Sequence, residues 1–284
     1  MRLRLKAAAK INWTLEAIGP RPDGFHEIKT VLQTIDLRDT LELERAPELT
    51  LDAPSEGLPP PDENLVARAA RLLQERARCR DGARMRLTKA VPVGAGLGGG
   101  SSDAAAALRG LNALWNLGLS QEALANLAAE LGSDVPFFLS GGTALAEGRG
   151  ERITSLPDIL RTALVIVVPP LAIPDKTRRM YSLLTAEDYS DGSASERLIE
   201  ALRQGESIRE EHLHNAFDRV AFRVFPELES YRRALLEAGA AAVHVAGSGP
   251  ALFVLVRDEE QRERLIQAAT AAGARGFAGS TIPA

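Results

Sequence analysis

The 284-residue sequence has one cysteine, Cys79, and no apolar run that approaches the ~20 residues of a membrane-spanning helix. The longest apolar run, TALVIVVPPLAIP, is interrupted by prolines and is typical of a buried strand. A single cysteine cannot form an internal disulfide, which suits a reducing compartment, and we expect Cys79 to be an unreactive helix residue. The N-terminus MRLRLKAAAKIN lacks the apolar core of a signal peptide. We therefore expect a cytoplasmic protein that has no membrane partner.

The sequence also lacks an excess of basic residues. Its 34 Lys and Arg stand against 38 Asp and Glu, which gives a net charge of −4 and a pI of about 5.7. A protein that binds nucleic acid mainly by electrostatics usually has a basic face, so we expect no nucleic-acid partner. Hydrophobic residues make up 45% and charged residues 25%, as in an ordinary globular protein. For the oligomeric state, we expect a monomer or a weak homodimer.

The first sixty residues are rich in β-branched and alternating residues, which predict short strands. These runs are LRLKA (3–7), INWTLEAI (11–18), HEIKTVLQTI (26–35), DTLELERA (39–46) and ELTLDA (48–53). Further strands are expected at ARMRLTKAV (83–91), after a turn within 133–153, at TALVIVVP (162–169), on both sides of Gly247-Ser248-Gly249, and at the end of the chain.

Helical spacing of apolar residues predicts helices between these strands. They are expected at 64–78, 101–114, from about Ser120, twice within 213–240, with Pro226 starting the second, and at 258–272. The stretch SDGSASE (190–196) is expected to be a surface loop. Because strand-rich and helical segments are mixed, the fold class is predicted as α+β in two lobes. The predicted lobes are residues 1–158, which are β-rich, and residues 159–284, an α/β sandwich.

The stretch PVGAGLGGGSSDAAAAL, which begins at Pro92, has five glycines between Gly94 and Gly100. Glycine loses more backbone freedom on folding than any other residue, so a close approach or an unusual backbone angle is expected here. The free N–H groups and the dipole of the following helix favour an anion. Ser101, Ser102 and Asp103 suit the cap and first turn of that helix. A tight strand-to-helix turn is the plainer interpretation, but it needs only one or two glycines.

Three well-known phosphate loops fit this stretch poorly. A Walker loop needs a lysine after its second glycine, and this loop has none. Gly94, Gly96 and Gly99 match GxGxxG, but the region about 20 residues on, NALWNLGL, lacks the acid of a dinucleotide-binding domain. A dehydrogenase therefore stays a distant alternative. The HRD and DFG triplets of protein kinases do not occur.

The loop instead resembles the second motif of the GHMP small-molecule kinases. The residues that carry the resemblance are Pro92, Gly96, Leu97, Gly98, Ser101, Ser102, Ala104 and Ala105. The resemblance implies a two-lobed GHMP kinase fold whose N-terminal lobe binds ATP. The implied ATP-binding residues are Pro92, Gly94, Ala95, Gly96, Leu97, Gly98, Gly99, Gly100, Ser101 and Ser102.

Four further stretches extend the resemblance over nearly the whole chain. They are AAAKINWTLEAIGPRPDGFHEIKTVLQTID, DENLVARAARLL, LGSDVPFFLSGG and VAGSGPALFVL. Together with the loop they resemble the branch of GHMP kinases that phosphorylates the 2-hydroxyl of cytidine diphosphate methylerythritol, on the non-mevalonate route to isoprenoid precursors. The resemblance implies this small molecule as the substrate. Another GHMP kinase, of homoserine or mevalonate type, and a non-catalytic nucleotide-binding relative stay open as alternatives.

Two charged residues fit the chemistry of phosphoryl transfer to an alcohol, which benefits from a carboxylate that takes the hydroxyl proton. Asp134 lies in a turn before Phe137-Phe138, and Lys10 lies among alanines and apolar residues. Spacing alone leaves a helix cap or Asx-turn open for Asp134 and a surface position for Lys10. The resemblance implies that they are the catalytic pair, with Asp134 as base and Lys10 orienting the carboxylate and the hydroxyl.

The resemblance also implies substrate-binding residues. Asp23-Gly24 is a hairpin signal, and the residues after it, Phe25 and His26, correspond to a tyrosine and a histidine that stack on the cytosine and read its edge. Phe25 keeps the stacking face but lacks the hydroxyl. We expect Asn12 on the strand face of Lys10. Gly247, Ser248 and Gly249 form the third motif, which is expected near the phosphates. A simple hairpin stays open for these three residues, and a structural role stays open for His26.

Some positions differ from the family pattern. Ala246 replaces a serine or threonine, and Asp175 and Lys176 follow Ile173-Pro174 where the family has a small hydroxyl residue and then a proline. These differences affect the expected substrate contacts rather than catalysis. We expect Mg²⁺ as a cofactor of ATP, held mainly by phosphates and water with Ser101 or Ser102, and no protein metal site. The histidines His212, His214 and His244 lack metal-ligand spacing and are expected to be structural or solvated.

Overall fold

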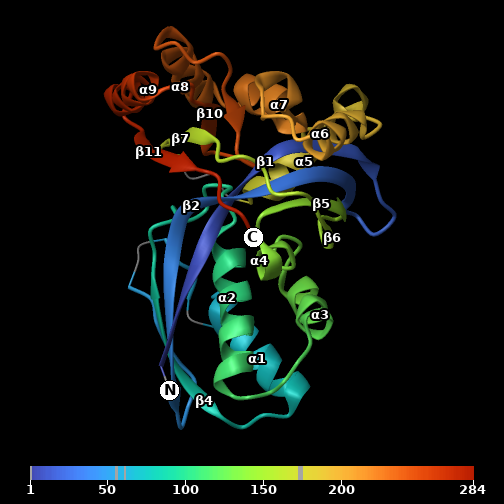
Figure 1. Cartoon of the computed structure of the whole chain (residues 1–284), viewed down its shortest axis with the longest axis vertical. Helices are drawn as coiled ribbons and strands as arrows, with labels where there is room; N and C mark the ends of the chain where they lie inside the picture. The colour runs from blue at the N-terminus through green and yellow to red at the C-terminus, as the bar shows by residue number, and fades with distance from the viewer. Residues whose placement is uncertain (1, 55–56, 61, 172–174) are drawn as a thin grey trace. The chain divides into compact units, whose positions relative to one another are not determined.

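The computed structural model describes residues 2–54, 57–60, 62–171 and 175–284. It divides into two compact units that alternate along the chain (Figure 1). Unit 1 contains residues 1–9, 37–93 and 98–141, and unit 2 contains residues 10–36, 94–97 and 142–284. Two long strands, β1 (Arg2–Pro20) and β2 (His26–Ala46), contribute residues to both units.

The described residues of unit 1 form a sheet and four helices. Strand β4 (Gly82–Thr88) is antiparallel to the second half of β2, with Thr40 opposite Thr88, and β3 (Thr50–Asp52) is parallel to β4. The helices are α1 (Leu65–Ala77), α2 (Gly99–Leu114), α3 (Gln121–Leu131) and the short α4 (Phe137–Ser140). At Gly110 a Cβ atom would lie 2.4 Å from a methyl group of Leu43, so this glycine lets α2 pack closely on the sheet.

Unit 2 contains the first half of β2, which pairs with β5 (Thr143–Gly148), and β5 pairs with β6 (Arg152–Ser155). Strand β8 (His214–Asn215) runs parallel to β1. A second sheet has the order β11-β7-β10-β9, built from β7 (Ala163–Val168), β9 (His244–Val245), β10 (Leu252–Leu255) and β11 (Arg275–Ser280).

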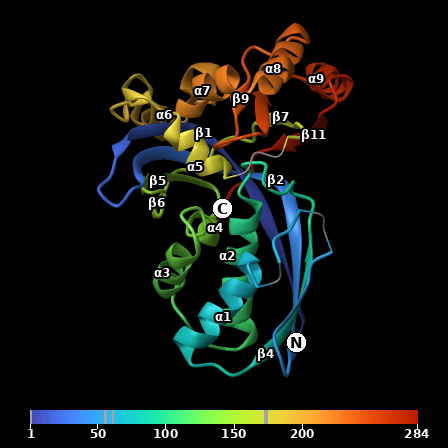
Figure 2. The same cartoon turned by 180° about the vertical axis from the view of Figure 1, so that it is seen from behind.

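Helices α7 (Ala216–Val224), α8 (Pro226–Glu237) and α9 (Glu259–Ala271) cover one face of this second sheet, as both views show (Figures 1 and 2). Their apolar residues join Val165, Val167 and Val254 in one core, and Leu15 and Ala17 of β1 belong to the same core. Unit 2 also contains α5 (Lys176–Ser182), α6 (Ser193–Arg203) and the 3-10 turns η1 (Ala186–Asp188) and η2 (Glu210–His212).

The α+β fold class is confirmed, but several sequence-based boundaries are wrong. The four runs expected between residues 3 and 46 are two long strands, because the polar residues within them stay in extended backbone. Helix α2 begins at Gly99, with Gly98 as its cap, so Ser101 and Ser102 lie inside the helix rather than before it. Helix α1 ends at Ala77, which leaves Cys79 beyond its left-handed cap, Arg78.

Two helices of unit 2 were not expected from the sequence, and one expected loop is wrong. Residues 193–196 of the stretch SDGSASE open helix α6. The carboxylate of Glu16 accepts hydrogen bonds from the Ala194 and Ser195 N–H groups and so caps this helix from a distant strand. Helix α5 follows Ile173-Pro174, and these two residues lie outside the part of the chain that the structure describes.

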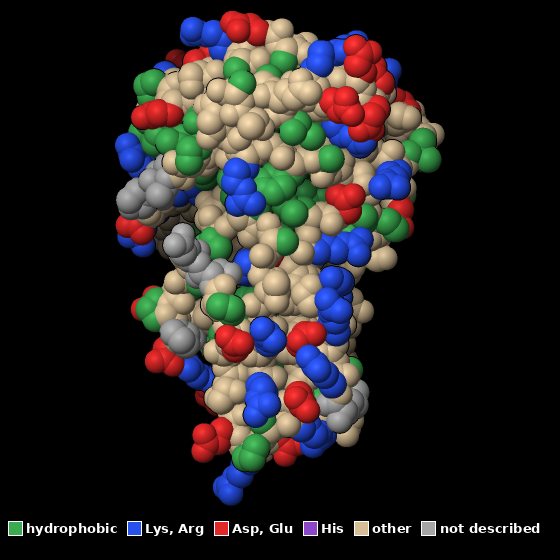
Figure 3. Space-filling view, turned by 90° about the vertical axis from the view of Figure 1, so that its left-hand side faces the viewer, with side chains coloured by type: hydrophobic (Ala, Val, Ile, Leu, Met, Phe, Trp, Pro, Cys, Tyr) green, Lys and Arg blue, Asp and Glu red, His purple; other side chains and the backbone are tan. Residues whose placement is uncertain are grey.

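No helix in the described part of the chain is long and apolar enough to cross a lipid bilayer. On the face drawn in Figure 3, lysine and arginine side chains are intermixed with aspartate and glutamate side chains.

Candidate active site

A buried lysine on β1 begins a chain of polar contacts in unit 2. Lys10 is 4% exposed, and its Nζ donates to Asn12 Oδ1 at 2.8 Å. Asn12 Nδ2 donates in turn to Thr30 Oγ1 at 2.8 Å. Residues two apart on a strand share a face, so the sequence-based placement of Asn12 beside Lys10 is confirmed. An ammonium buried in this way is fixed by oriented acceptors, and its position is set by two strands.

Two glycine turns of unit 2 pack backbone to backbone. At Gly96 a Cβ atom would lie 2.3 Å from the Ala246 carbonyl oxygen and 2.6 Å from that of Gly249. The Ala251 N–H donates to the Ala95 carbonyl oxygen at 3.0 Å, which ties residues 94–97 to the segment after the second turn. Only glycine fits at residue 96, because its φ of +92° and the approaching backbone both exclude a side chain.

Lys10 lies directly beside both turns. Its backbone N–H donates to the Leu97 carbonyl oxygen at 2.9 Å. A Cβ atom on Gly247 would lie 3.1 Å from Lys10 Nζ and 3.0 Å from the Gly96 carbonyl oxygen. The structure therefore brings together Lys10, Asn12, residues 94–97 and Gly247. These residues come from three separate stretches of the sequence, and each stretch was predicted to have a functional role.

The rest of the glycine loop opens helix α2 in unit 1. Gly98 has a φ of +72°, and its carbonyl oxygen accepts from the Ser102 N–H at 2.9 Å. Gly94, Gly96 and Gly98 alternate with Ala95 and Leu97, which are buried. The buried side chains of Ala95 and Leu97 anchor the loop, and its backbone turns at the glycines. The first-turn N–H groups of a helix that starts this way are available to an anion.

Lys89 belongs to a buried ion cluster in unit 1. Its Nζ donates to Asp103 Oδ2 at 2.6 Å and also to Asp39 Oδ2. Asp39 Oδ1 accepts from the Ala90 and Val91 N–H groups just before the loop. Burial raises the pKa of Asp103 to about 7, opposed by Lys89 and assisted by the Asp39 carboxylate. The cluster fixes both ends of the loop, from Val91 to Asp103.

Asp134 lies half-buried in the turn between α3 and α4 of unit 1. The Val135 N–H donates to the Gly132 carbonyl oxygen at 3.2 Å, which closes this turn, and Phe137 and Phe138 after it are buried. The edge-to-face contact of the two rings, with centroids 5.0 Å apart, anchors the turn from one side. In the same unit, the Asn64 side chain caps α1 by accepting from the Val66 N–H at 2.9 Å.

Comparisons with known proteins identify the family. Residues 64–142 match the GHMP kinases N terminal domain, and residues 198–275 match the GHMP kinases C terminal domain. A 4-diphosphocytidyl-2-C-methyl-D-erythritol kinase of Dehalococcoides mccartyi (strain BAV1) is 40% identical over 281 residues, which covers 99% of this chain and 98% of the relative. The chain belongs to the GHMP kinase family. The sequence-based assignment to this family of kinases is therefore confirmed.

Two further comparisons agree on the branch of the GHMP kinase family. A protein of Pelotomaculum thermopropionicum with the same name is 44% identical over 262 residues, which covers 91% of each chain. A crystal structure of 4-(cytidine 5'-diphospho)-2C-methyl-D-erythritol kinase matches with a TM-score of 0.84 at 36% identity, over 99% of this chain and 100% of that one. Membership of the family also supports ATP as the phosphoryl donor, as the glycine loop predicted.

A GHMP kinase that binds a nucleobase needs aromatic and polar groups, and unit 2 has such a cluster around His26. Tyr181 stacks on the His26 ring with centroids 4.8 Å apart, and the Tyr189 hydroxyl lies 3.4 Å from His26 Nε2. Burial lowers the pKa of His26, so at neutral pH the ring is uncharged and has one donor and one acceptor nitrogen. Neither tyrosine was singled out from the sequence, because nothing local connects them to His26.

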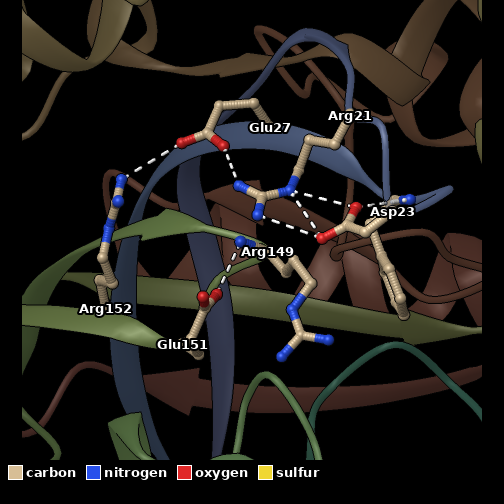
Figure 4. A network of polar contacts seen from close by, with 7 residues as sticks. Arg21, Asp23, Glu27, Arg149, Glu151 and Arg152 are labelled. Carbon is tan, nitrogen blue, oxygen red and sulfur yellow. Dashed lines mark hydrogen bonds and ion pairs between the residues drawn. The ribbon is translucent and has the colours of Figure 1, made fainter.

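Phe25 lies beside this histidine and is 50% exposed, unusually open for a large apolar ring. The guanidinium carbon of Arg149 lies 4.8 Å from its ring centroid. Figure 4 shows the surrounding ion network, in which Arg21 pairs with Asp23 and Glu27 and holds the hairpin tip. The backbone N–H of Arg149 donates to Glu151 Oε2 at 2.6 Å. Sequence reasoning missed Arg149 because no local pattern connects it to Phe25, which lies more than 100 residues earlier in the chain.

Lys176, which departs from the family pattern, contacts both glycine turns of unit 2. Its Nζ donates to the Gly94 carbonyl oxygen at 2.9 Å and to the Gly249 carbonyl oxygen. The next residue, Thr177, has its hydroxyl 3.2 Å from the Ser248 hydroxyl. Ala246, the other departure, is buried, and its carbonyl oxygen accepts from the Gly249 N–H at 2.9 Å. The missing hydroxyl at residue 246 thus leaves the turn closed.

Proposed function

We propose that this chain is an ATP-dependent kinase that phosphorylates the 2-hydroxyl of 4-diphosphocytidyl-2-C-methyl-D-erythritol, giving the 2-phosphate and ADP, on the non-mevalonate route to isoprenoid precursors. The observation that carries the proposal is the buried Lys10 ammonium, held by Asn12 and set against Gly247 beside the backbone of Gly96. A fixed cation next to two glycine turns is suited to a reaction in which phosphate charge must be offset.

In the proposed mechanism Asp134 accepts the proton of the attacking hydroxyl, and Lys10 orients the hydroxyl and offsets charge on the transferred phosphoryl group. The role of Asp134 is supported by its family resemblance and by its fixed turn. Phosphoryl transfer has a loose transition state, so the proton need not leave before the bond to phosphorus forms. Asp134 takes the proton as the hydroxyl oxygen bonds to the γ-phosphorus and the bond to the ADP oxygen breaks.

We propose that residues 92–102 bind the ATP phosphates through backbone N–H groups. Support comes from the positive φ angles of Gly94, Gly96 and Gly98 and from the loop's continuation into helix α2. Hydroxyl oxygens such as those of Ser101 and Ser102 suit Mg²⁺, which takes one or two protein oxygens and keeps phosphates and water as its other ligands. When bound, Mg²⁺ would offset phosphate charge.

We propose that the cytosine binds beside Phe25 and His26. The exposed ring of Phe25 offers a stacking face, and the neutral His26 ring offers a donor and an acceptor to the base edge. Arg149, above Phe25, and Tyr181, beside His26, belong to the same proposed base site. Asn12 and Gly247 are assigned to the diphosphate and the acceptor alcohol because both lie beside Lys10. Ser248 and Gly249 are assigned there as the rest of the same glycine motif.

The remaining expectations complete the proposal. The N-terminal GHMP domain is assigned to residues 1–158 and the C-terminal one to residues 159–284, so that the two family matches at 64–142 and 198–275 fall one in each. We also propose a cytoplasmic monomer or weak homodimer whose partners are small molecules, without nucleic acid or membrane.

The decisive experiment measures ADP release from Mg·ATP with and without 4-diphosphocytidyl-2-C-methyl-D-erythritol. We expect release that depends on this substrate in the wild type and that falls about 100-fold or more in Asp134→Asn, because a general base typically contributes 10²–10⁴-fold. Asp62→Asn, which removes an exposed carboxylate from the same unit, is the matched control and should keep wild-type activity.

The alternatives predict different results in this assay. ADP release that ignores the cytidyl compound and responds to homoserine or mevalonate would assign the chain to another GHMP kinase. Wild-type protein that binds ATP but turns over none of these acceptors would be a non-catalytic relative. Full activity in Asp134→Asn would keep the kinase and remove Asp134 as the base.

A further inference from the structure

Lys176 places a positive charge where two glycine turns of unit 2 meet. Its Nζ donates to the carbonyl oxygen of Gly94, in the first turn, and of Gly249, in the second. Both turns also contact the segment of Lys10, through the Leu97 carbonyl oxygen and through Gly247. Lys176 is half-buried, whereas its neighbours Asp175 and Thr177 are exposed. Its ammonium is directed to the two turns.

Charge favours a second kind of acceptor for this ammonium. Carbonyl oxygens carry only partial charge, whereas phosphate oxygens carry full negative charge. An ammonium that donates to a phosphate oxygen therefore gains an ion pair in addition to its hydrogen bond. The stretch from Pro92 to Ser102 contains no lysine or arginine of its own, although loops that hold a triphosphate commonly use one. Lys176 reaches the first residue of the glycine run, Gly94, from a helix 82 residues further along the chain.

We propose that Lys176 is a phosphate-binding residue of the kinase, whose ammonium donates to a β- or γ-phosphate oxygen of the bound nucleotide in exchange for one of the two carbonyls. Thr177, whose hydroxyl meets that of Ser248, holds the start of α5 to the second turn while this exchange takes place. The inference rests on the proposed function for the identity of the nucleotide. It adds a cation that the resemblance does not supply, because the family pattern has other residues at this place.

The test measures nucleotide binding rather than turnover, in the full chain. Calorimetry of ATP and of AMP, which lacks the β- and γ-phosphates, is carried out on wild type, Lys176→Gln and Lys176→Arg. We expect Lys176→Gln to weaken ATP binding about tenfold or more, as loss of a charged hydrogen bond does. The affinity for AMP should stay within about twofold of the wild-type value. Lys176→Arg keeps the charge and should recover most of the ATP affinity.

Arg178→Gln is the matched control, because it removes one charge from the exposed side of the same helix. It should leave ATP affinity within about twofold, which separates a direct contact from a change in net charge. In steady-state kinetics Lys176→Gln should raise the KM for ATP and leave the KM for the cytidyl alcohol unchanged.

Three results would overturn the inference. Lys176→Gln could bind ATP as tightly as the wild type does, it could lose the same affinity for ATP and for AMP, or the wild type could bind no ATP. Equal weakening would mean that Lys176 only holds the two turns together. Failure of the proposed function looks different, since a wild type that binds ATP but does not phosphorylate the cytidyl alcohol leaves the comparison of ATP with AMP intact.

Discussion

At the scale of single residues, the sequence was informative where chemistry depends on a local pattern. Lys10 and Asn12 are two apart on a strand, so their shared face follows from the period of β structure, and their 2.8 Å contact agrees with it. Arg149 and Lys176 could not be found this way. Each reaches its partner across more than 70 residues of chain, and no local signal in a single sequence carries such a contact.

Gly247 gives a sharp test at this scale, because a methyl group there would point at the ammonium of Lys10. In Gly247→Ala the new Cβ would lie 3.1 Å from Lys10 Nζ and 3.0 Å from the Gly96 carbonyl oxygen, so either the lysine or the turn must move. We expect kcat to fall about 10- to 100-fold, since misplacement of a catalytic group by about 1 Å has effects of this size.

The control for this prediction is Gly205→Ala. Gly205 also has a positive φ, +73°, but nothing lies within 4 Å of a Cβ atom placed there. Both variants should lose about 1–2 kcal/mol of stability from backbone strain. Only Gly247→Ala should lose kcat in an ADP-release assay, and equal kcat values in the two variants would show that Lys10 tolerates displacement.

At the scale of elements, periodicity predicted most helices and missed those whose stability comes from distant partners. Helices α1 and α3 begin one residue after Asn64 and Ser120, whose side chains cap them. Helix α6 begins at a polar stretch that looks like a loop, because its cap is the carboxylate of Glu16 on β1. Strands β1 and β2 are longer than any predicted run, since pairing with several neighbours keeps their polar positions extended.

His244 connects three elements of unit 2 and makes their stability depend on pH. Its Nδ1 lies 2.9 Å from Asp218 of α7, and its Nε2 lies 3.2 Å from Glu210 of η2. Burial alone would lower the pKa of His244, but hydrogen bonds with Asp218 and Glu210 raise it to about 9. Because the folded pKa lies above the unfolded value of 6.5, the stabilisation is complete below about pH 6.5 and is lost as pH rises through about 9.

We therefore expect His244→Gln to lower the free energy of unfolding more at pH 6 than at pH 9.5. The difference between these two pH values should be at most about 3 kcal/mol, from a shift of this size at 1.36 kcal/mol per pKa unit. Urea unfolding of wild type and variant at both pH values measures it, with His212→Gln as the control imidazole in the same unit. A penalty that does not change with pH would show that His244 stays neutral in the folded protein.

At the scale of the whole molecule, the order of the chain does not follow the compact units. Unit 2 takes residues 10–36 from the N-terminal part and residues 94–97 from the middle of the glycine loop. Composition and motifs predicted an α+β protein but could not predict this alternation, because it depends on which long-range strand pairings form. Strands β1 and β2 pass from one unit to the other without a break, between residues 9 and 10 and between residues 36 and 37.

Continuous strands of this kind predict that the two units unfold together. A unit that unfolded alone would pull half of β1 and half of β2 out of hydrogen-bonded structure, so the remaining halves would lose neighbours on the same strands. The chain offers a direct probe, because its two tryptophans, Trp13 in unit 2 and Trp115 in unit 1, are both buried.

The measurement uses two single-tryptophan variants, Trp115→Phe and Trp13→Phe. In each variant we expect the urea midpoint from tryptophan fluorescence to coincide with the midpoint from far-UV circular dichroism, which reports on both units. Comparing two probes within one variant removes the effect of the substitution on stability. Separate midpoints, with one tryptophan exposed while much of the circular dichroism signal remains, would show that β1 and β2 can unfold halfway and that the units are independent.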